Sequence, residues 1–324
     1  MSVLDTIKEP IQQELKEFEH TFQRVLKSDI PLLNIVINFI IRRKGKQMRP
    51  ILVFLSARIS GEITHSTYIA ASMIEMLHTA SLIHDDVVDD SYERRNYFSI
   101  NALWKSKMAV LIGDYLLAQG MLLSVNNQEH DILRIVSDAV KEMSQGELLQ
   151  IQESRKLSIT EEKYFEIIRK KTATLLSACA ACGAKSVRAS DEVVERMARF
   201  GEKMGIAFQI QDDLLDYQLE SHTGKPSGND IKEKKITLPL IYALHNSASY
   251  ERRKILSLIN KGESNTGALT EIIDFIRSKG GIEYSIKKMN EIRDDAIKIL
   301  DFFPDSASKR SLREFAIFTT SRKQ

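Results

Sequence analysis

The chain has few of the residues that break helices or that cross-link secreted domains. Its 324 residues include only 6 prolines and 14 glycines, a content that favours long helices. Its 2 cysteines are too few for a disulfide framework and favour a reducing, cytoplasmic location. The formal net charge is only +2, so the composition does not favour a nucleic-acid partner or an anionic membrane surface.

The N-terminal region lacks the signals of secretion and membrane insertion. Residues 1–23 are polar and mixed in charge, unlike a secretory signal. The longest apolar run near them, Ile30 to Ile41, holds about a dozen residues, whereas a membrane span needs about 20. We therefore expect a core helix there and no transmembrane segment. The Cys179-x-x-Cys182 spacing has no second pair, so we expect two buried residues rather than a zinc or redox site.

Helical periodicity runs through almost the whole chain, and no convincing alternating strand interrupts it. Hydrophobic residues make up 43% of the chain, enough to bury a large core. We expect a single all-α domain over residues 1–324. The expected helices are 3–26, 31–41, 48–60, 67–89, 99–123, 131–154, 160–181, 190–219, 238–245, 251–259, 268–279, 281–300 and 306–319.

Two aspartate clusters of the same design are the clearest chemical feature: Asp85-Asp86-Val-Val-Asp89 and Asp212-Asp213-Leu-Leu-Asp216. Positions i, i+1 and i+4 fall within about 100° on one helix face, so the three carboxylates crowd and raise one another's pKa. Divalent cations remove this penalty, and Mg²⁺ also shares its ligand shell with phosphates. The matching clusters predict a divalent-metal site built from two facing helices.

Basic residues accompany the aspartates. Lys46 and Arg49 stand at an expected helix start, where backbone N–H groups and the helix dipole attract anions. Further cations follow the same pattern: Arg94-Arg95 just after the first cluster, Lys171 beside Thr172, Lys225 and Lys235. The polar segment 220–235 directly follows the second cluster and is a candidate functional loop. Aspartates, metal ions and cations together favour substrates that carry diphosphates.

The chain at this point resembles trans-prenyltransferases of the polyprenyl diphosphate synthase family. The matching segments are Gly-Lys-Gln-Met-Arg-Pro (45–50), His78 to Asp90, Arg94-Arg95, Lys171-Thr172, Phe208 to Asp216, Gly224-Lys-Pro, and Lys235 to Leu240. The resemblance spans about residues 30–300. It implies an isoprenoid-synthase fold, a large helical barrel around a deep apolar central cavity, usually as a homodimer. The implied reaction is Mg²⁺-dependent head-to-tail condensation of isopentenyl diphosphate with an allylic diphosphate.

The resemblance also implies roles for individual residues. About three Mg²⁺ ions would bind at Asp85, Asp86, Asp89, Asp212, Asp213 and Asp216. Isopentenyl diphosphate would bind to Lys46, Arg49, His78 and Arg95. The allylic diphosphate would bind to Arg94, Lys171, Thr172, Gln209, Lys225 and Lys235. Catalysis would rest chiefly on Asp85, Asp86, Asp89, Lys171, Asp212 and Lys225. Three departures from the family pattern, Lys44, Asn96 and Lys234, replace glycines common in its loops.

Product length would depend on the residues one turn before the first cluster. Ala80 and Ser81 are small, where short-chain enzymes of the family often carry an aromatic residue. A small pair opens the cavity toward a deeper floor, which Leu116, Met121 or Leu122 would line. We therefore expect all-trans products longer than C15, and weak membrane contact during product release is compatible with such products. The alternative is a shorter-chain farnesyl or geranylgeranyl diphosphate synthase.

Three rival functions remain to be distinguished. An HD-type phosphohydrolase would use His84-Asp85, but such sites need several histidines and the chain has only 7. A terpene cyclase would carry a second metal motif based on Asn, Ser and Glu. A non-catalytic helical partner subunit would gain nothing from six unscreened carboxylates. Prenyl transfer fits the two intact clusters best.

Overall fold

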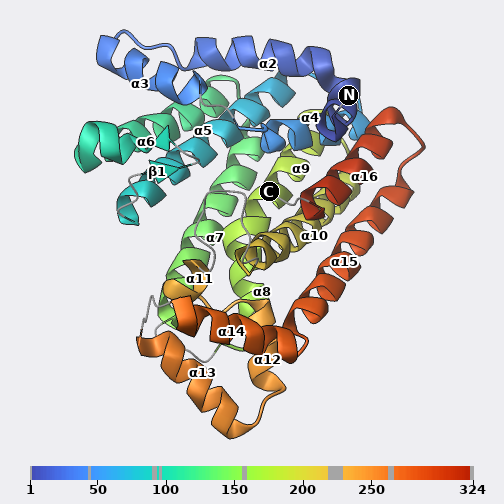
Figure 1. The fold of residues 1–324 in the computed structure, drawn as a ribbon. Helices are drawn as coiled ribbons and strands as arrows, with labels where there is room; N and C mark the ends of the chain where they lie inside the picture. Colours follow the sequence, from blue (N-terminus) through green and yellow to red (C-terminus); the bar gives the residue numbers. More distant parts are fainter. Residues whose placement is uncertain are drawn as a thin grey trace. The chain divides into compact units, whose positions relative to one another are not determined.

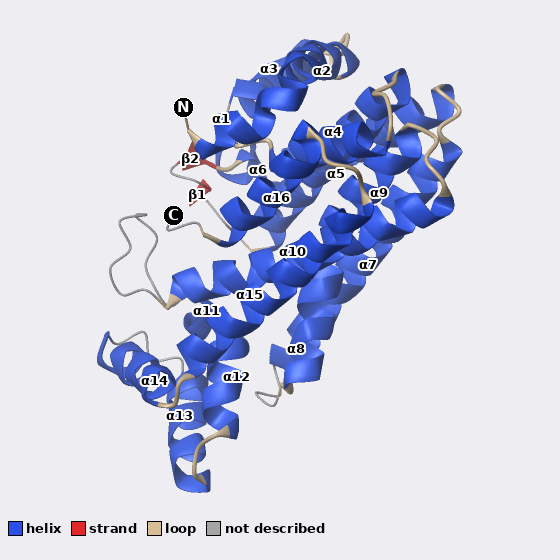
Figure 2. Ribbon diagram, turned by 90° about the vertical axis from the view of Figure 1, so that its right-hand side faces the viewer, coloured by secondary structure: helices blue, strands red, loops and turns tan. Residues whose placement is uncertain are grey.

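The computed structural model of the chain describes residues 2–42, 45–89, 93–94, 97–154, 159–217, 229–261 and 266–321. Helices dominate these residues (Figure 2), which confirms the all-α prediction. Two short strands, β1 (Glu93–Arg94) and β2 (Tyr97–Phe98), pair antiparallel, with Glu93 opposite Phe98 and Arg94 opposite Tyr97. The sequence periodicity did not predict this hairpin, because two-residue strands are too short to show alternation.

The helices follow one another along the chain (Figure 1). Their bounds are α1 (Val3–Lys8), η1 (Glu9–Ile11), α2 (Gln12–Val25), α3 (Pro31–Arg42), α4 (Met48–Ser60), α5 (His65–Val88), α6 (Ile100–Asn126), α7 (His130–Ser154), α8 (Glu161–Ile168), η2 (Arg169–Ala173), α9 (Thr174–Ser186), α10 (Asp191–Asp216), α11 (Asn229–Lys232), α12 (Leu238–His245), α13 (Ser249–Lys261), α14 (Thr266–Ser278), α15 (Gly281–Ile299), η3 (Leu300–Phe302) and α16 (Ala307–Thr320).

The chain divides into two compact units. Unit 1 comprises residues 1–137, 178–197 and 305–312, and unit 2 comprises residues 138–177, 198–304 and 313–324. Four of the five boundaries fall inside helices, α7, α9, α10 and α16, and the fifth lies between η3 and α16, so each unit is built from several separate stretches of sequence. A single domain over residues 1–324 stays a prediction.

Unit 1 is built around α4 and the pair α5–α6. Residues Pro50 to Ala57 of α4 are all buried, the pattern of a helix surrounded by others. The α5 and α6 helices pack along each other (Figure 1), and small residues on α6 allow their close approach. At Gly113 an added Cβ would lie 2.1 Å from the His84 Nε2 atom, so the residue before the first aspartate cluster packs directly on α6.

Unit 2 has its own apolar core, formed by α8, α10, α12, α14 and α15. The core includes Ile210 and Leu214 of α10, Leu238 of α12 and Ile273 of α14, together with two fully buried tyrosines, Tyr164 and Tyr217. The buried apolar residues of α10 precede and interleave with the second aspartate cluster. The cluster is therefore anchored to a rigid core.

Three helices differ from the sequence prediction. The expected helix 3–26 is divided by η1, where Pro10 lacks the N–H that an uninterrupted helix would use. The expected helix 160–181 contains a π-helical turn, η2. Within α6, Lys105 has a non-helical backbone with φ of 67°, so a short first turn is set off from the remainder.

Candidate active site

The first aspartate cluster closes α5. Asp85 and Asp86 lie in its last turn, and Asp89 caps the end, donating its backbone N–H to the Asp85 carbonyl at 2.9 Å. Asp86 is only 5% exposed, whereas the side chains of Asp85 and Asp89 are exposed. A helix C-terminus carries partial negative charge, so three carboxylates there are unfavourable unless a cation binds.

The histidine next to this cluster turns toward α6. The His84 Nε2 atom lies 3.3 Å from the Val110 carbonyl oxygen and 3.5 Å from Asp114 Oδ1. Over the described ranges, no three His, Cys, Asp or Glu side chains are grouped so that they could hold a metal ion. This holds for the two aspartate clusters as well as for His84 and Asp85, so the grouping alone favours neither an HD-type site nor the predicted one.

Three of the candidate residues for isopentenyl diphosphate, Lys46, Arg49 and His78, belong to unit 1. Gln47 adopts the left-handed conformation, with φ 54° and ψ 38°, and α4 begins at the next residue. Lys46 is exposed just before the helix, and Arg49 lies half-buried in its first turn. A non-glycine residue held in this conformation is typical of functional loops. His78 lies half-buried on α5, two turns before the aspartates.

Some predicted residues lie where the structure gives little or no description. The backbone of Arg94 is in β1, opposite Tyr97. Arg95, Asn96, Lys44 and Lys225 lie outside the described residues. Their predicted roles stay predictions.

A π-helical turn carries Lys171 and Thr172. The turn η2 widens the helix between α8 and α9, and such turns occur frequently at functional sites. The Lys171 Nζ atom lies 2.5 Å from Glu147 Oε2 and donates to Gln150 Oε1 at 3.2 Å, both on α7. Gly146 of α7 packs against this turn, because an added Cβ would lie 2.6 Å from the Lys171 backbone nitrogen.

A chain of hydrogen bonds joins this turn to the second aspartate cluster. The Thr172 hydroxyl donates to Gln209 Oε1 at 2.7 Å, and Gln209 Nε2 donates to Asp213 Oδ1 at 2.8 Å. The Tyr164 hydroxyl donates to the other carboxylate oxygen, Asp213 Oδ2, at 2.6 Å. The structure thus brings together three predicted residues and one, Tyr164, that sequence reasoning missed.

The second cluster repeats the burial pattern of the first. Asp212 is exposed, whereas Asp213 is only 5% exposed. The pKa of Asp213 is raised to about 8, chiefly by burial and then by the charge of the nearby Asp230, while the two hydrogen bonds oppose the shift. Burial and the charge of Asp213 also raise the pKa of Tyr164 well above its ordinary value, so its hydroxyl stays protonated and donates. The neighbouring Asp212 contributes to this rise, as the carboxylate spacing predicts, but burial is the larger cause.

Asp230, another residue missed by sequence reasoning, lies beside the cluster. Its backbone N–H donates to Asp216 Oδ2 at 2.9 Å, and its carbonyl accepts the Lys235 N–H at 2.8 Å. The Lys235 ammonium pairs with Glu233 and lies 4.0 Å from Asp230 Oδ1. Burial, followed by the charge of Asp216, raises the pKa of Asp230 to about 6. Lys234 has φ of 58°, which explains why the family commonly has glycine at this position.

The predicted chain-length residues differ in their burial. Ala80 is fully buried on α5, Ser81 is half-buried, and Leu116 of α6 is buried. Met121 and Leu122 are 49% and 54% exposed, so in the single chain they do not line a buried floor.

One described helix, α6, is long and apolar enough to cross a membrane by length and composition. Core helices of soluble proteins pass the same test, and 33% of its most apolar window is buried. Its composition alone therefore does not define a membrane span.

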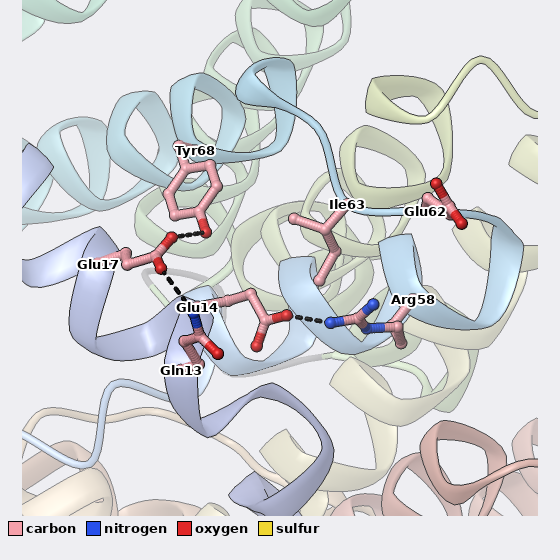
Figure 3. A pocket seen from close by; sticks show the side chains of 7 residues that line it. All are labelled: Gln13, Glu14, Glu17, Arg58, Glu62, Ile63 and Tyr68. Atoms are coloured by element: carbon pink, nitrogen blue, oxygen red, sulfur yellow. Dashed lines mark hydrogen bonds and ion pairs between the residues drawn. The ribbon is translucent and has the colours of Figure 1, made fainter.

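The pocket in Figure 3 lies away from the candidate residues. This cavity of about 240 Å³ is lined by residues of α2, of α4 and α5, and of the loop between the last two. The Tyr68 hydroxyl donates to Glu17 at 2.7 Å, and Arg58 pairs with Glu14. These contacts tie α2 to the rest of unit 1.

Comparison with known proteins gives a consistent assignment. The polyprenyl synthetase family model matches residues 30–276. The chain is 36% identical over 306 residues to the all-trans-nonaprenyl-diphosphate synthase (geranyl-diphosphate specific) of Rhodobacter capsulatus, covering 94% of this chain and 93% of that protein.

Solved structures agree with this assignment. A decaprenyl diphosphate synthase from Rhodobacter capsulatus superposes with a TM-score of 0.93 at 32% identity, covering 99% of both chains. A Caulobacter crescentus polyprenyl synthase complexed with calcium and isoprenyl diphosphate gives 0.90 at 30% identity, covering 99% of this chain and 98% of that one. A geranylgeranyl pyrophosphate synthase from Bacteroides thetaiotaomicron gives 0.85 at 38% identity, covering 99% and 100%. The chain belongs to the polyprenyl synthetase family and is a prenyltransferase with its all-α fold.

Proposed function

We propose that this protein condenses isopentenyl diphosphate head to tail with an allylic diphosphate, giving an all-trans polyprenyl diphosphate longer than C15. The observation that carries the proposal is the repeated cluster at the ends of α5 and α10. Each cluster presents an exposed first aspartate and a second aspartate that is 5% exposed. Carboxylate clusters of this kind suit the cations that a diphosphate substrate needs as counter-ions.

We infer that the metal is Mg²⁺, with about three ions per site. Carboxylate oxygens are the ligands that this hard cation prefers, and the clusters stand where helix carbonyls make negative charge costly. The donor set therefore fits the ion. The structure of the Caulobacter crescentus protein, which contains calcium, also supports the use of a divalent cation. When bound, the ions supply positive charge that stabilises the departing diphosphate.

The basic residues of the chain have two roles in this proposal. Lys46, Arg49, His78 and Arg95 bind isopentenyl diphosphate, and Arg94, Lys171, Thr172, Gln209, Lys225 and Lys235 bind the allylic diphosphate. Because the cationic members of this set place positive charge beside the departing diphosphate, they lower the barrier to cleavage of the allylic carbon–oxygen bond. Apolar walls protect the allylic cation from water until the isopentenyl double bond attacks it. The released diphosphate then accepts the proton that is lost.

The proposed product length depends on Ala80. The buried alanine one turn before the aspartates has a smaller side chain than the aromatic residue that short-chain enzymes often carry there, which supports products longer than C15. The long-chain activity named for the Rhodobacter capsulatus relative points the same way. The geranylgeranyl synthase from Bacteroides thetaiotaomicron favours C20 as the second candidate.

A product assay tests this function. The purified protein is incubated with Mg²⁺, isopentenyl diphosphate and a series of allylic starters, and the products are measured by mass spectrometry. We expect products longer than C20, and Ala80→Phe should shorten them. A product that ends at C15 refutes the proposed length, and one that ends at C20 supports the second candidate instead of a longer chain. No condensation by the purified protein alone refutes the proposed function and favours a partner subunit.

We also propose that the protein is a homodimer joined through α6. Six apolar side chains of this helix are between 40% and 54% exposed: Leu103, Val110, Leu111, Met121, Leu122 and Val125. An exposed apolar stripe of this kind is typical of a protein interface. Sedimentation should give a dimer, and Leu111→Asp should dissociate it, whereas Tyr250→Asp on the exposed face of α13 should not. A monomeric wild-type protein would contradict this arrangement.

A further inference from the structure

Tyr164 is a buried tyrosine whose hydroxyl points at an aspartate of the second cluster. The side chain lies in the apolar core of unit 2 and is only 4% exposed. Its hydroxyl donates to Asp213 Oδ2 at 2.6 Å. Apolar packing alone would be satisfied by phenylalanine, so the hydroxyl needs a separate reason.

The two bonds to Asp213 fix the carboxylate at both oxygens. Gln209 Nε2 donates to Oδ1 at 2.8 Å while Tyr164 donates to Oδ2. When Asp213 is ionised these bonds are charge-assisted, which places them among the strongest in proteins, and each oxygen keeps one lone pair for a further contact. The carboxylate plane therefore has one preferred orientation.

The same bonds determine the orientation of the neighbouring amide. Because Gln209 uses its NH₂ group on Asp213, its carbonyl oxygen accepts the Thr172 hydroxyl at 2.7 Å. Each residue thus donates to the next, from Thr172 to Gln209 and from Gln209 to Asp213, and Tyr164 donates to Asp213 from the other side. The two ends of this chain lie on the helix that contains η2, and its middle lies on α10.

We propose that Tyr164 is a positioning residue, which orients Asp213 and, through Gln209, the candidate allylic-diphosphate residue Thr172. This inference rests on the proposed function, because Asp213, Gln209 and Thr172 bind ligand only if diphosphate is the substrate. Tyr164 itself touches the aspartate and not the substrate. Loss of its hydroxyl should weaken ligand binding without removing any ligand-binding group.

The test uses the full-length protein and the Tyr164→Phe variant. Calorimetry measures the binding of inorganic diphosphate in the presence of Mg²⁺, a readout independent of turnover, and kinetics measures KM and kcat with the allylic substrate. We expect diphosphate affinity to fall about tenfold, corresponding to about 1.4 kcal/mol. The KM for the allylic substrate should rise more than kcat falls.

Two control variants separate positioning from packing. Tyr217 is equally buried in the same core, but its hydroxyl pairs with Thr237, so Tyr217→Phe controls for burial. Tyr284 donates to the carboxylate of Glu161, outside the candidate site, so Tyr284→Phe controls for a lost tyrosine–carboxylate bond. Both should keep diphosphate affinity within twofold, even where the free energy of unfolding decreases.

A double-mutant cycle identifies the residue through which Tyr164 acts. In the Asp213→Ala background, Tyr164→Phe should have no further effect, because the acceptor oxygens that it orients are absent. This background also covers the case in which Tyr164→Phe alone does not fold. Additive effects, or an equal loss in Tyr217→Phe, overturn the inference. A wild-type protein that binds no diphosphate would instead refute the proposed function.

Discussion

Gly146→Ala is the substitution for which the structure gives the clearest expected magnitude. The added Cβ would lie 2.6 Å from the Lys171 backbone nitrogen, whereas ordinary contacts begin at 3.4 Å, a shortfall of 0.8 Å (3.4 − 2.6). Because the obstacle is backbone, the η2 turn must move by about that distance. A misplacement of about 1 Å in a catalytic group can cost about a hundredfold in rate, so we expect kcat/KM to fall by about that factor.

Stability should change much less than activity in this variant. Overpacking costs about 1–3 kcal/mol, while replacing a helical glycine with alanine returns about 1 kcal/mol. Urea unfolding should therefore show a loss of at most about 2 kcal/mol. Gly120→Ala is the matched control, because its Cβ would meet Met73 Cγ at an ordinary 3.7 Å. That variant should keep full activity, and wild-type kcat/KM in Gly146→Ala would refute the reasoning.

Three further predictions concern other parts of the molecule. Burial raises the pKa of the Cys179 thiol to about 12, so at pH 8 a thiol reagent should label neither it nor the buried Cys182 until urea unfolds the protein. Rapid labelling of the native protein would contradict this. Tyr68→Phe removes the hydrogen bond to Glu17 (Figure 3) and should lower the free energy of unfolding by about 1 kcal/mol, with unchanged condensation rates. A chelator should abolish condensation and Mg²⁺ should restore it; persistent activity in the chelator would exclude the proposed metal dependence.

The local features of the site could be predicted from the sequence. The first cluster lies at the end of α5 and the second at the end of α10. Both could be assigned to helices from the sequence, because helical periodicity and carboxylate spacing are properties of short segments. The α4 helix has the predicted bounds, Met48–Ser60, for the same reason. Family resemblance then related these segments to one reaction.

The features that the sequence did not reveal depend on contacts between distant residues. Tyr164 stands 49 positions before the aspartate that it contacts, and nothing in its own segment marks it. Asp230 lies in a polar segment with several other charged residues, and nothing in the sequence distinguishes it as the residue that contacts Asp216. Burial of Asp213 is likewise a tertiary property, so the sequence predicted the direction of its pKa shift from the neighbouring carboxylates but not the larger contribution of burial.

The π-helical turn η2 also bears on how relatives of this protein are aligned. Each residue added to or removed from a helix rotates everything after it by about 100°. A relative with one residue fewer between Arg169 and Ala173 would close the wide turn into a regular α-helix. The lysine and threonine side chains would then point to a different side of the helix, although the motif letters still matched. In this segment, a single-residue gap in an alignment is a change in side-chain direction.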